Sequence, residues 1–266
     1  MAPLPKTFPL RNARVRFAGE TNIGRKRQLN EDSYYVPGDM SLIIVADGMG
    51  GHASGEVASR MAVETVIGYF TETQDDCEQT WPYKMDGHDR YDLNRLVTAA
   101  KLANLRIWQT AQRSERQHGM GTTLVTAYFV DDFVCVGHVG DSRCYRIRDN
   151  MIHQLTEDHS LLNDYVRMKK LRTDEIGNFQ HKNVIVRALG MKEQVQVEVT
   201  RDVPRAGDLY LLCSDGLSGM LPDEQILEIA LAKQDPQEIC SDLINAANAN
   251  GGVDNITAVL AQVVPG

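Results

Sequence analysis

Basic residues are in short supply. The chain has 28 Lys and Arg against 36 Asp and Glu, which gives a formal net charge of -8. An extended nucleic-acid interface needs a basic surface, so this balance argues against nucleic acid as a partner. An acidic surplus fits the binding of cations better.

Cysteine is also scarce, and the five cysteines are odd in number and show no C-x-x-C spacing. This pattern argues against a disulfide framework and against a structural zinc site. The residues concerned are Cys77, Cys135, Cys144, Cys213 and Cys240. We expect them to be reduced packing residues of a cytoplasmic protein.

Long apolar runs and low-complexity tracts are missing as well. No stretch is long enough to span a bilayer, and Met1 to Phe17 mixes proline with arginine instead of forming a signal-peptide core. The 42% hydrophobic and 24% charged shares are ordinary for a globular protein, and 266 residues can bury one substantial core. We expect a single folded domain that is neither exported nor membrane-embedded.

Short apolar runs rich in β-branched residues predict strands, several of them buried on both faces. These strands are expected at residues 42–46, 122–130, 133–139, 195–199, 209–213 and 256–264. Helical periodicity predicts helices at residues 54–70, 93–116, 223–232 and 236–248, the last capped by Asp235. Grouped strands and paired helices indicate antiparallel or mixed sheets with helices packed outside. The polar stretches 71–91 and 159–182 are expected to be a surface connection and a flap.

The most distinctive local feature follows the first of these strands. The run at residues 42–46 continues as Asp47-Gly48-Met49-Gly50-Gly51-His52. A carboxylate at a strand end, followed by glycines that allow close backbone approach, suits an ion or phosphate site. A tight turn with a capping aspartate is the alternative at this point. A Walker-type phosphate loop is disfavoured because no GK[ST] follows.

Further acidic groups are spread along the chain beside predicted strands. They are Glu31, Asp32, Asp141, Asp215 and Asp254. Each alone is compatible with a turn residue, but strands could bring them to one edge of a sheet. Crowded carboxylates repel one another unless cations lie between them, and ligation by oxygen alone favours Mg²⁺ or Mn²⁺ over zinc.

Six motifs together resemble the metal-dependent PPM (type 2C) protein phosphatases. They are Arg27-x-x-x-Glu31-Asp32, Asp47-Gly48-Met49-Gly50-Gly51, Gly121-Thr122-Thr123, Gly140-Asp141-Ser142-Arg143, Ser214-Asp215-Gly216-Leu217 and Asp254-Asn255-Ile256-Thr257. The resemblance runs from about Phe17 to Val263 in the order of the family. Met49 and the small size without extra domains are similar to its bacterial branch.

This resemblance implies an α+β fold, a four-layer αββα sandwich in which two central antiparallel β-sheets are flanked by pairs of helices. The expected organisation is an N-terminal extension at residues 1–16 and a single phosphatase domain at 17–264. A flap at about 159–182 would lie near the active site.

The resemblance also implies the reaction. A metal-dependent serine/threonine protein phosphatase hydrolyses phosphoserine and phosphothreonine in proteins by in-line attack of a water or hydroxide that bridges two metals, without a phosphoenzyme. The expected partners are phosphorylated proteins, with a serine/threonine kinase acting in opposition, and the expected state is a monomer.

The matching positions give the expected metal ligands, for Mn²⁺ or Mg²⁺. Asp47 would bridge two core ions, with Glu31 and the carbonyl of Gly48 completing one side of the centre. Asp215 and Asp254 would complete the other side. A third, weaker ion would be held by Asp141 and Asp215, and Asp32 would orient a metal-bound water.

Two further residues are expected to act on the phosphate and on the leaving group. Arg27 could clamp the phosphate, because a guanidinium pairs with two phosphate oxygens; the alternative is a solvated base in the Arg25-Lys26-Arg27 cluster. The leaving alkoxide needs a proton donor. One branch of the family has a histidine where this chain has Met49, and His52 is the nearest substitute. Metal-bound water is the alternative acid, with His52 then only a surface residue.

Two other functions compete with a protein phosphatase. One is a catalytically silent PPM-like module that binds a phosphoprotein without turning it over, and such a module would be expected to have lost metal carboxylates. The other keeps the metals but hydrolyses a small phosphomonoester or phosphodiester. All the carboxylates that align are present, which favours the enzyme.

Overall fold

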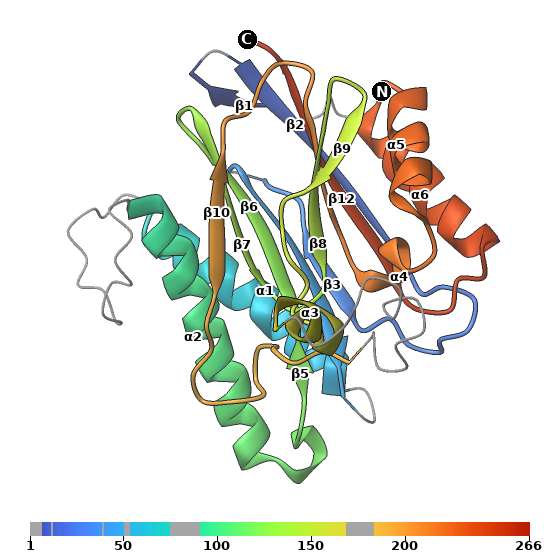
Figure 1. Ribbon diagram of the computed structural model, residues 1–266. Coiled ribbons are helices and arrows are strands. Elements are labelled where there is room, and N and C mark those ends of the chain that lie inside the picture. Colours follow the sequence, from blue (N-terminus) through green and yellow to red (C-terminus); the bar gives the residue numbers. More distant parts are fainter. Residues whose placement is uncertain (1–6, 12, 39, 51–53, 75–90, 169–183) are drawn as a thin grey trace.

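A computed structural model describes residues 7–11, 13–38, 40–50, 54–74, 91–168 and 184–266 (Figure 1). Its centre consists of two six-stranded sheets in which every named strand pair is antiparallel. The first sheet has the order β1 (Thr7–Leu10), β2 (Ala13–Asn22), β12 (Ile256–Pro265), β11 (Leu209–Cys213), β8 (Arg143–Arg148) and β9 (Met151–Gln154). The second has the order β10 (Glu198–Asp202), β7 (Phe133–Val139), β6 (Leu124–Val130), β4 (Leu42–Met49) and β3 (Asp32–Tyr35), and the short β5 (Gly121–Thr122) pairs with β4.

Helices cover the outer faces of both sheets, as Figure 1 shows. On the second sheet lie α1 (Ser54–Glu72) and α2 (Tyr91–Arg113), and on the first lie α5 (Asp223–Ala232) and α6 (Pro236–Ala249). The shorter helices are α3 (Leu161–Arg167), α4 (Asp215–Ser218) and the 3-10 turn Glu115–Gln117. This is the predicted four-layer αββα sandwich.

The alternation of side chains along the central strands builds three hydrophobic cores. In β4, Leu42 and Ile44 pack into the core beneath α1 and α2, whereas Ile43 and Val45 pack between the two sheets. Successive side chains of a strand point to opposite faces, so a strand covered on both sides must be apolar at every position. That requirement is why the apolar runs were recognisable as strands.

Several predicted elements are confirmed at their bounds. The strands at 133–139 and 209–213 and the helix at 223–232 match β7, β11 and α5. Asp235 caps α6, because its side chain accepts hydrogen bonds from the N–H groups of Gln237 and Glu238. The cap of α6 therefore forms at Asp235, where helix-capping chemistry predicts it.

Other elements differ from prediction. The strand expected at 195–199 begins at Glu198 and ends at Asp202, because it pairs with β7, while Val195 packs against the helical core instead. The long helix expected at 93–116 ends at Arg113. Most of the polar stretch 71–91 and of the expected flap, namely residues 75–90 and 169–183, lies outside the described residues.

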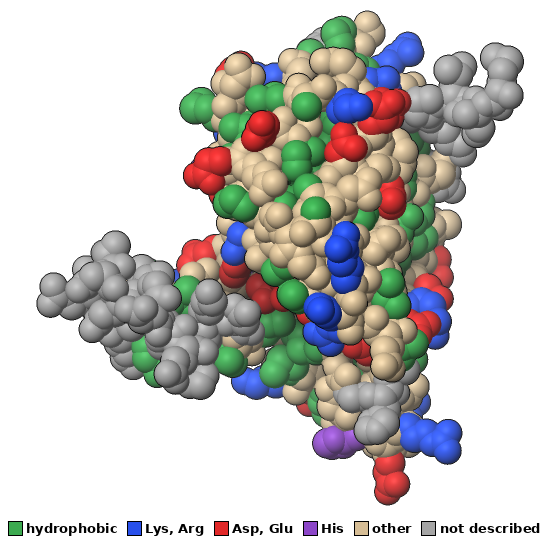
Figure 2. Space-filling model, turned by 90° about the vertical axis from the view of Figure 1, so that its right-hand side faces the viewer, with side chains coloured by type: hydrophobic (Ala, Val, Ile, Leu, Met, Phe, Trp, Pro, Cys, Tyr) green, Lys and Arg blue, Asp and Glu red, His purple; other side chains and the backbone are tan. Residues whose placement is uncertain are grey.

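The distribution of charge on the surface bears on the predicted absence of a nucleic-acid partner. On the face shown in Figure 2, acidic and basic side chains are interspersed and hydrophobic side chains form only small groups. The described residues on that face form no extended basic stripe of the kind that nucleic acid requires. Among the described residues, no helix has the length and apolarity to cross a membrane.

Candidate metal centre

An acidic pocket of about 220 Å³ lies where the ends of β4, β11 and β12 meet. It is lined by Arg27, Glu31, Asp47, Gly48, Met49, Gly50, Ile185, Asp215, Asp254 and Asn255. The structure therefore brings together four of the predicted carboxylates, the predicted glycine and the predicted arginine. Asp32 and Asp141 lie behind this lining and are 7% and 8% exposed.

Asp47 is fixed at the end of β4 by its own backbone. Its N–H donates to Thr123 Oγ1 at 2.9 Å, and its carbonyl accepts from the Thr123 N–H at 2.8 Å. In the neighbouring strand β3, Asp32 lies directly opposite Asp47. The antiparallel register thus places two carboxylic acids side by side at one end of the sheet.

Gly48 allows α1 to approach this strand end closely. Its N–H donates to the Glu31 carbonyl at 3.1 Å, and a Cβ at residue 48 would overlap the carbonyl oxygen of Gly55. Glu31 Oε1 in turn accepts from the Gly55 N–H at 3.2 Å. The glycine requirement here is one of close backbone contact, which holds the Glu31 side chain against the start of the helix.

Asp215 and Asp254 come from adjacent strands of the other sheet. Asp215 is the first residue of α4, just after β11, and Asp254 comes just before β12. Because β11 and β12 pair antiparallel, the end of one strand lies beside the start of the other. Asp254 Oδ1 accepts from the Asn255 N–H at 2.8 Å, which fixes the carboxylate toward the pocket residues.

Asp32 connects the two sheets. Its Oδ2 accepts hydrogen bonds from Ser214 Oγ at 2.8 Å and from Thr257 Oγ1 at 2.6 Å, and both partners belong to the sheet that carries Asp215. Its Oδ1 is buried and has no hydrogen-bond partner. The roles of Ser214 and Thr257 were not predicted, although both residues stand in the motifs that identified the site.

The carboxylates raise one another's pKa. Burial raises the pKa of Asp32 to about 6 and that of Asp141 to about 7, and the charge of Asp215 adds to both effects. Desolvation also raises the pKa of Asp47 well above its usual value, with further contributions from Asp32 and Asp215. Desolvation and the charge of Asp254 raise the pKa of Asp215. A cluster in this state favours bound protons or bound cations.

The residues fit divalent cations. Asp141 Oδ1, like Asp32 Oδ1, is a buried oxygen with no hydrogen-bond partner, so two acceptors at the centre are unsatisfied by protein alone. The atoms at the pocket that could bind a metal are carboxylate and backbone oxygens, which Mg²⁺ and Mn²⁺ prefer as ligands. A cation would offset the repulsion that raises these pKa values.

Among the residues that the structure describes, Arg27 is the one basic residue that lines the pocket. Its guanidinium donates to Asp254 Oδ2 at 2.6 Å, and this hydrogen bond raises the pKa of Arg27 further. The side chain is half exposed, so its other N–H groups remain accessible from the pocket opening. The role of Arg27 as a phosphate clamp stays a prediction. His52, the proposed proton donor, lies outside the described residues.

A pH dependence follows from these pKa values. A carboxyl group whose folded pKa is raised stabilises the fold at low pH, and this contribution is lost as the pH rises through about 7 for Asp141. In EDTA, protonation of Asp141 alone should add about 1 kcal/mol to the free energy of unfolding from pH 8 to pH 6.5. Histidines oppose this change, because burial lowers the pKa of His138 and of His159 in the folded chain.

Urea unfolding at the two pH values measures this change, and Asp141→Asn is the control. From pH 8 to pH 6.5, the free energy of unfolding of the variant should gain about 1 kcal/mol less than that of the unsubstituted chain, because this titrating group is gone. Saturating Mn²⁺ should also remove the Asp141 contribution in the unsubstituted chain, since cations compete with protons for the same oxygens. An unchanged slope in Asp141→Asn would contradict the assignment.

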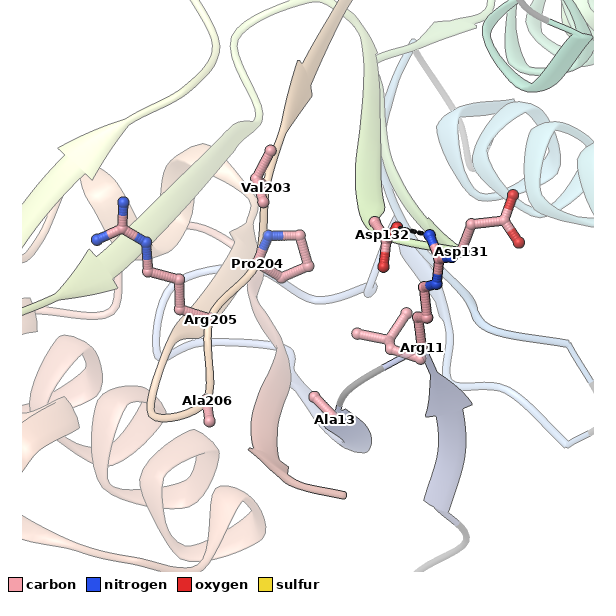
Figure 3. A pocket seen from close by; sticks show the side chains of 9 residues that line it. Arg11, Ala13, Asp131, Asp132, Val203, Pro204, Arg205 and Ala206 are labelled. Carbon is pink, nitrogen blue, oxygen red and sulfur yellow. Dashed lines mark hydrogen bonds and ion pairs between the residues drawn. The ribbon is translucent and has the colours of Figure 1, made fainter.

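A second hollow, of about 410 Å³, lies at the opposite end of the sheets (Figure 3). Figure 3 shows Arg11 paired with Asp132 beside it, at 3.1 Å, and Arg205 directed away from that pair. The arginine charge nearest the hollow is thus already balanced. The acidic pocket groups four carboxylates with Arg27, so it is the better candidate for phosphate chemistry.

The chain is similar to known protein phosphatases. The protein phosphatase 2C family matches residues 19–261. The serine/threonine phosphatase stp of Listeria monocytogenes serovar 1/2a is 37% identical over 251 residues, which are 91% of this chain and 93% of that protein.

Solved structures agree as well. The crystal structure of the serine/threonine phosphatase PstP/Ppp of Mycobacterium tuberculosis has a TM-score of 0.80 and 36% identity, covering 94% of this chain and 99% of that one. The catalytic domain of PstP in complex with two manganese ions has a TM-score of 0.77 and 36% identity, covering 94% of this chain and 98% of that one. The predicted resemblance is confirmed, and the chain belongs to the protein phosphatase 2C family of metal-dependent serine/threonine phosphatases.

Proposed function

We propose that this serine/threonine protein phosphatase hydrolyses phosphoserine and phosphothreonine at the acidic pocket. The observation that carries the proposal is the grouping of carboxylates from both sheets around one opening, with Arg27 facing them. Two buried oxygens there have no protein partner, which leaves them for cations or water. The relatives named stp and PstP are serine/threonine phosphatases, which supports the same substrate class here.

The cation ligands are proposed from the same geometry. Asp47 would bridge two core ions, and besides desolvation the charges of Asp32, Asp215, Asp141 and Asp254 raise its pKa. Glu31 and the Gly48 carbonyl would complete one side, and Asp215 and Asp254 the other. A third, weaker ion would be held by Asp141 and Asp215. The manganese in the PstP structure supports Mn²⁺, with Mg²⁺ as the alternative.

Cations held by these residues would supply an activated water for in-line attack on phosphorus. The chain's own groups do the rest. Asp32 uses Oδ2 to anchor itself to Ser214 and Thr257, and its free Oδ1 would accept a hydrogen bond from water and hold that water in line. No side chain needs to carry the phosphoryl group.

Arg27 would bind the phosphate directly. A guanidinium has five N–H donors in a fixed fork, and one of them is used by Asp254. That hydrogen bond orients the group, while the remaining donors can pair with two phosphate oxygens and stabilise charge in the transition state. For the leaving alkoxide we keep His52 as the proposed proton donor, with water as the alternative.

The wider organisation is also a proposal. Residues 17–264 would form one phosphatase domain with a flap at about 159–182, and residues 1–16 an N-terminal extension, part of which forms β1 and the start of β2. The protein would act as a cytoplasmic monomer on phosphoproteins, in opposition to a serine/threonine kinase. The four cysteines in the described part of the chain are free and buried, which fits a reducing compartment.

Phosphate release from a phosphothreonine peptide tests the function. We expect release with Mn²⁺ or Mg²⁺ and none with EDTA, because the nucleophile depends on bound cations. A parallel assay with nucleotide substrates should show much slower release. A folded, cation-loaded chain that releases no phosphate from any substrate would support the silent binding module instead, and preferential release from nucleotides would support a small-molecule phosphatase.

A further inference from the structure

A buried group of three titratable side chains lies behind the turn that carries Asp141. His138 from β7 and His159 stack with their ring centroids 4.6 Å apart and the rings inclined by 18°. Both are almost fully buried, and Glu198 from β10 lies beside them, with Oε1 3.0 Å from His159 Nε2. The predicted mechanism uses none of the three.

The spacing of these side chains resembles a metal site, but a cation is already present. The Arg187 guanidinium lies 2.9 Å from His159 Nε2 and 3.0 Å from Glu198 Oε1. His138 Nε2 is 2.9 Å from the carbonyl of Glu157. A metal ion would have to displace Arg187 and break hydrogen bonds that are satisfied, so this group serves another purpose.

His159 holds the neighbouring Gly140 at two points. The Gly140 N–H donates to His159 Nδ1 at 3.0 Å, and the Gly140 carbonyl accepts from the His159 N–H at 2.9 Å. Since Nδ1 is an acceptor, the ring proton is on Nε2 and is donated to Glu198, and Arg187, which can only donate, bonds to Glu198 and not to the ring. Burial lowers the pKa of His159 to about 4, so the ring keeps this neutral form at physiological pH.

Gly140 determines where the next residue, Asp141, is placed. Its φ of +110° is rarely adopted by other residues, and a Cβ would come within 2.7 Å of the Thr123 side chain. On the far side of the turn, Ser142 Oγ is 2.7 Å from Thr123 Oγ1, which also accepts from the Asp47 N–H. The turn is therefore held on one side by His159 and on the other by the strand of Asp47.

His159 also contacts the segment that carries a pocket residue. The Val186 N–H donates to the His159 carbonyl at 2.9 Å, and Ile185, the adjacent residue, lines the pocket. Ser160 and Ile185 form an isolated antiparallel bridge. One residue thus joins the wall of the pocket to the turn of Asp141.

We propose that His159 is a positioning residue, which holds Asp141 through Gly140 in the place needed to bind the weaker third cation and couples that place to Ile185. The inference rests on the proposed function for the assignment of Asp141 as a ligand. Glu198 and Arg187 support it by fixing the tautomer and orientation of the ring, as groups behind metal ligands commonly do.

Calorimetric titration of the full chain with Mn²⁺, without substrate, tests the proposal. His159→Phe keeps a ring for packing but loses both ring hydrogen bonds, so we expect the weakest Mn²⁺-binding step to weaken by about tenfold or more. The two tighter steps should change less than about threefold. His159→Asn should bind nearly as the unsubstituted chain does, because its side-chain oxygen can still accept the Gly140 N–H. His153→Phe in β9 is the matched control.

Thermal unfolding shows whether each variant is folded. If His159→Phe is not, Glu198→Leu tests the same hydrogen bond from a more exposed position, with an expected loss of about threefold that Glu198→Gln restores. A third step equal to that of His153→Phe, or a chain that binds only two Mn²⁺, would overturn the proposal. Phosphate release by the unsubstituted chain, measured on the same samples, shows independently whether the proposed function holds.

Discussion

Asp47→Asn is expected to abolish phosphate release and, at the same time, to stabilise the cation-free protein. Asp47 is the carboxylate that would bridge both core cations, so its loss should lower kcat/KM by on the order of 10³-fold. Desolvation and, after it, the charges of neighbouring acids raise the pKa of Asp47, so its ionised form is destabilised in the absence of cations. A neutral amide of the same shape removes that repulsion.

Unfolding in the presence and absence of Mn²⁺ separates the two effects. In EDTA we expect Asp47→Asn to be more stable by about 1 kcal/mol or more at pH 7.5. Saturation with cation at one hundred times Kd should add about 2.7 kcal/mol to the unsubstituted chain and much less to the variant. The control is Asp242→Asn on α6, outside the pocket, which should change neither quantity. A variant that is less stable in EDTA would contradict the repulsion argument.

Arg27→Ala is expected to lower kcat/KM for a phosphothreonine peptide by on the order of 10²-fold. The reason is the loss of charge-assisted hydrogen bonds to phosphate oxygens, which strengthen as the transition state forms. Arg27→Lys should recover only part of the activity, because an ammonium group cannot make the paired contacts of a guanidinium. Steady-state kinetics with Mn²⁺ at saturation measures both variants.

The neighbouring Lys26 provides a matched control for charge. Lys26 is exposed and lies outside the pocket lining, so Lys26→Ala should reduce the rate only slightly. Calorimetry should show Mn²⁺ binding to Arg27→Ala within about threefold of the unsubstituted chain, since Arg27 contributes no ligand. Equal effects of the two alanine substitutions would show that Arg27 acts only as one base of a solvated cluster.

The strands that could be predicted are those whose surroundings require an apolar residue at every position. β4, β7 and β11 are covered on both faces and read as continuous apolar runs. β8 could not be recognised in this way, because it carries arginines that pair with acids far along the chain. Arg146 pairs with Asp202 and Arg148 with Asp208, and no local sequence signal identifies those partners.

The candidate site, like the fold, has some features that the sequence predicts and others that it does not. The carboxylates could be predicted because each stands in a short motif beside a strand end. Their supporting contacts could not, since these depend on how two sheets face each other. Ser214 and Thr257 reach Asp32 from more than 180 residues away in sequence. Ile185, which lines the pocket from the segment beside His159, has no sequence signal that would place it there.

The pocket also has a mechanical consequence, because its ligands are divided between two separate sheets. Asp47 belongs to one sheet, Asp215 and Asp254 to the other, and Asp32 bonds across the boundary. Bound cations would therefore link the two sheets, in addition to the apolar packing, hydrogen bonds and ion pairs that already join them. Cation affinity would therefore depend on how the two sheets are aligned. A change in the packing between the sheets, at Val45 or Val259 for instance, would alter cation affinity without replacing a ligand.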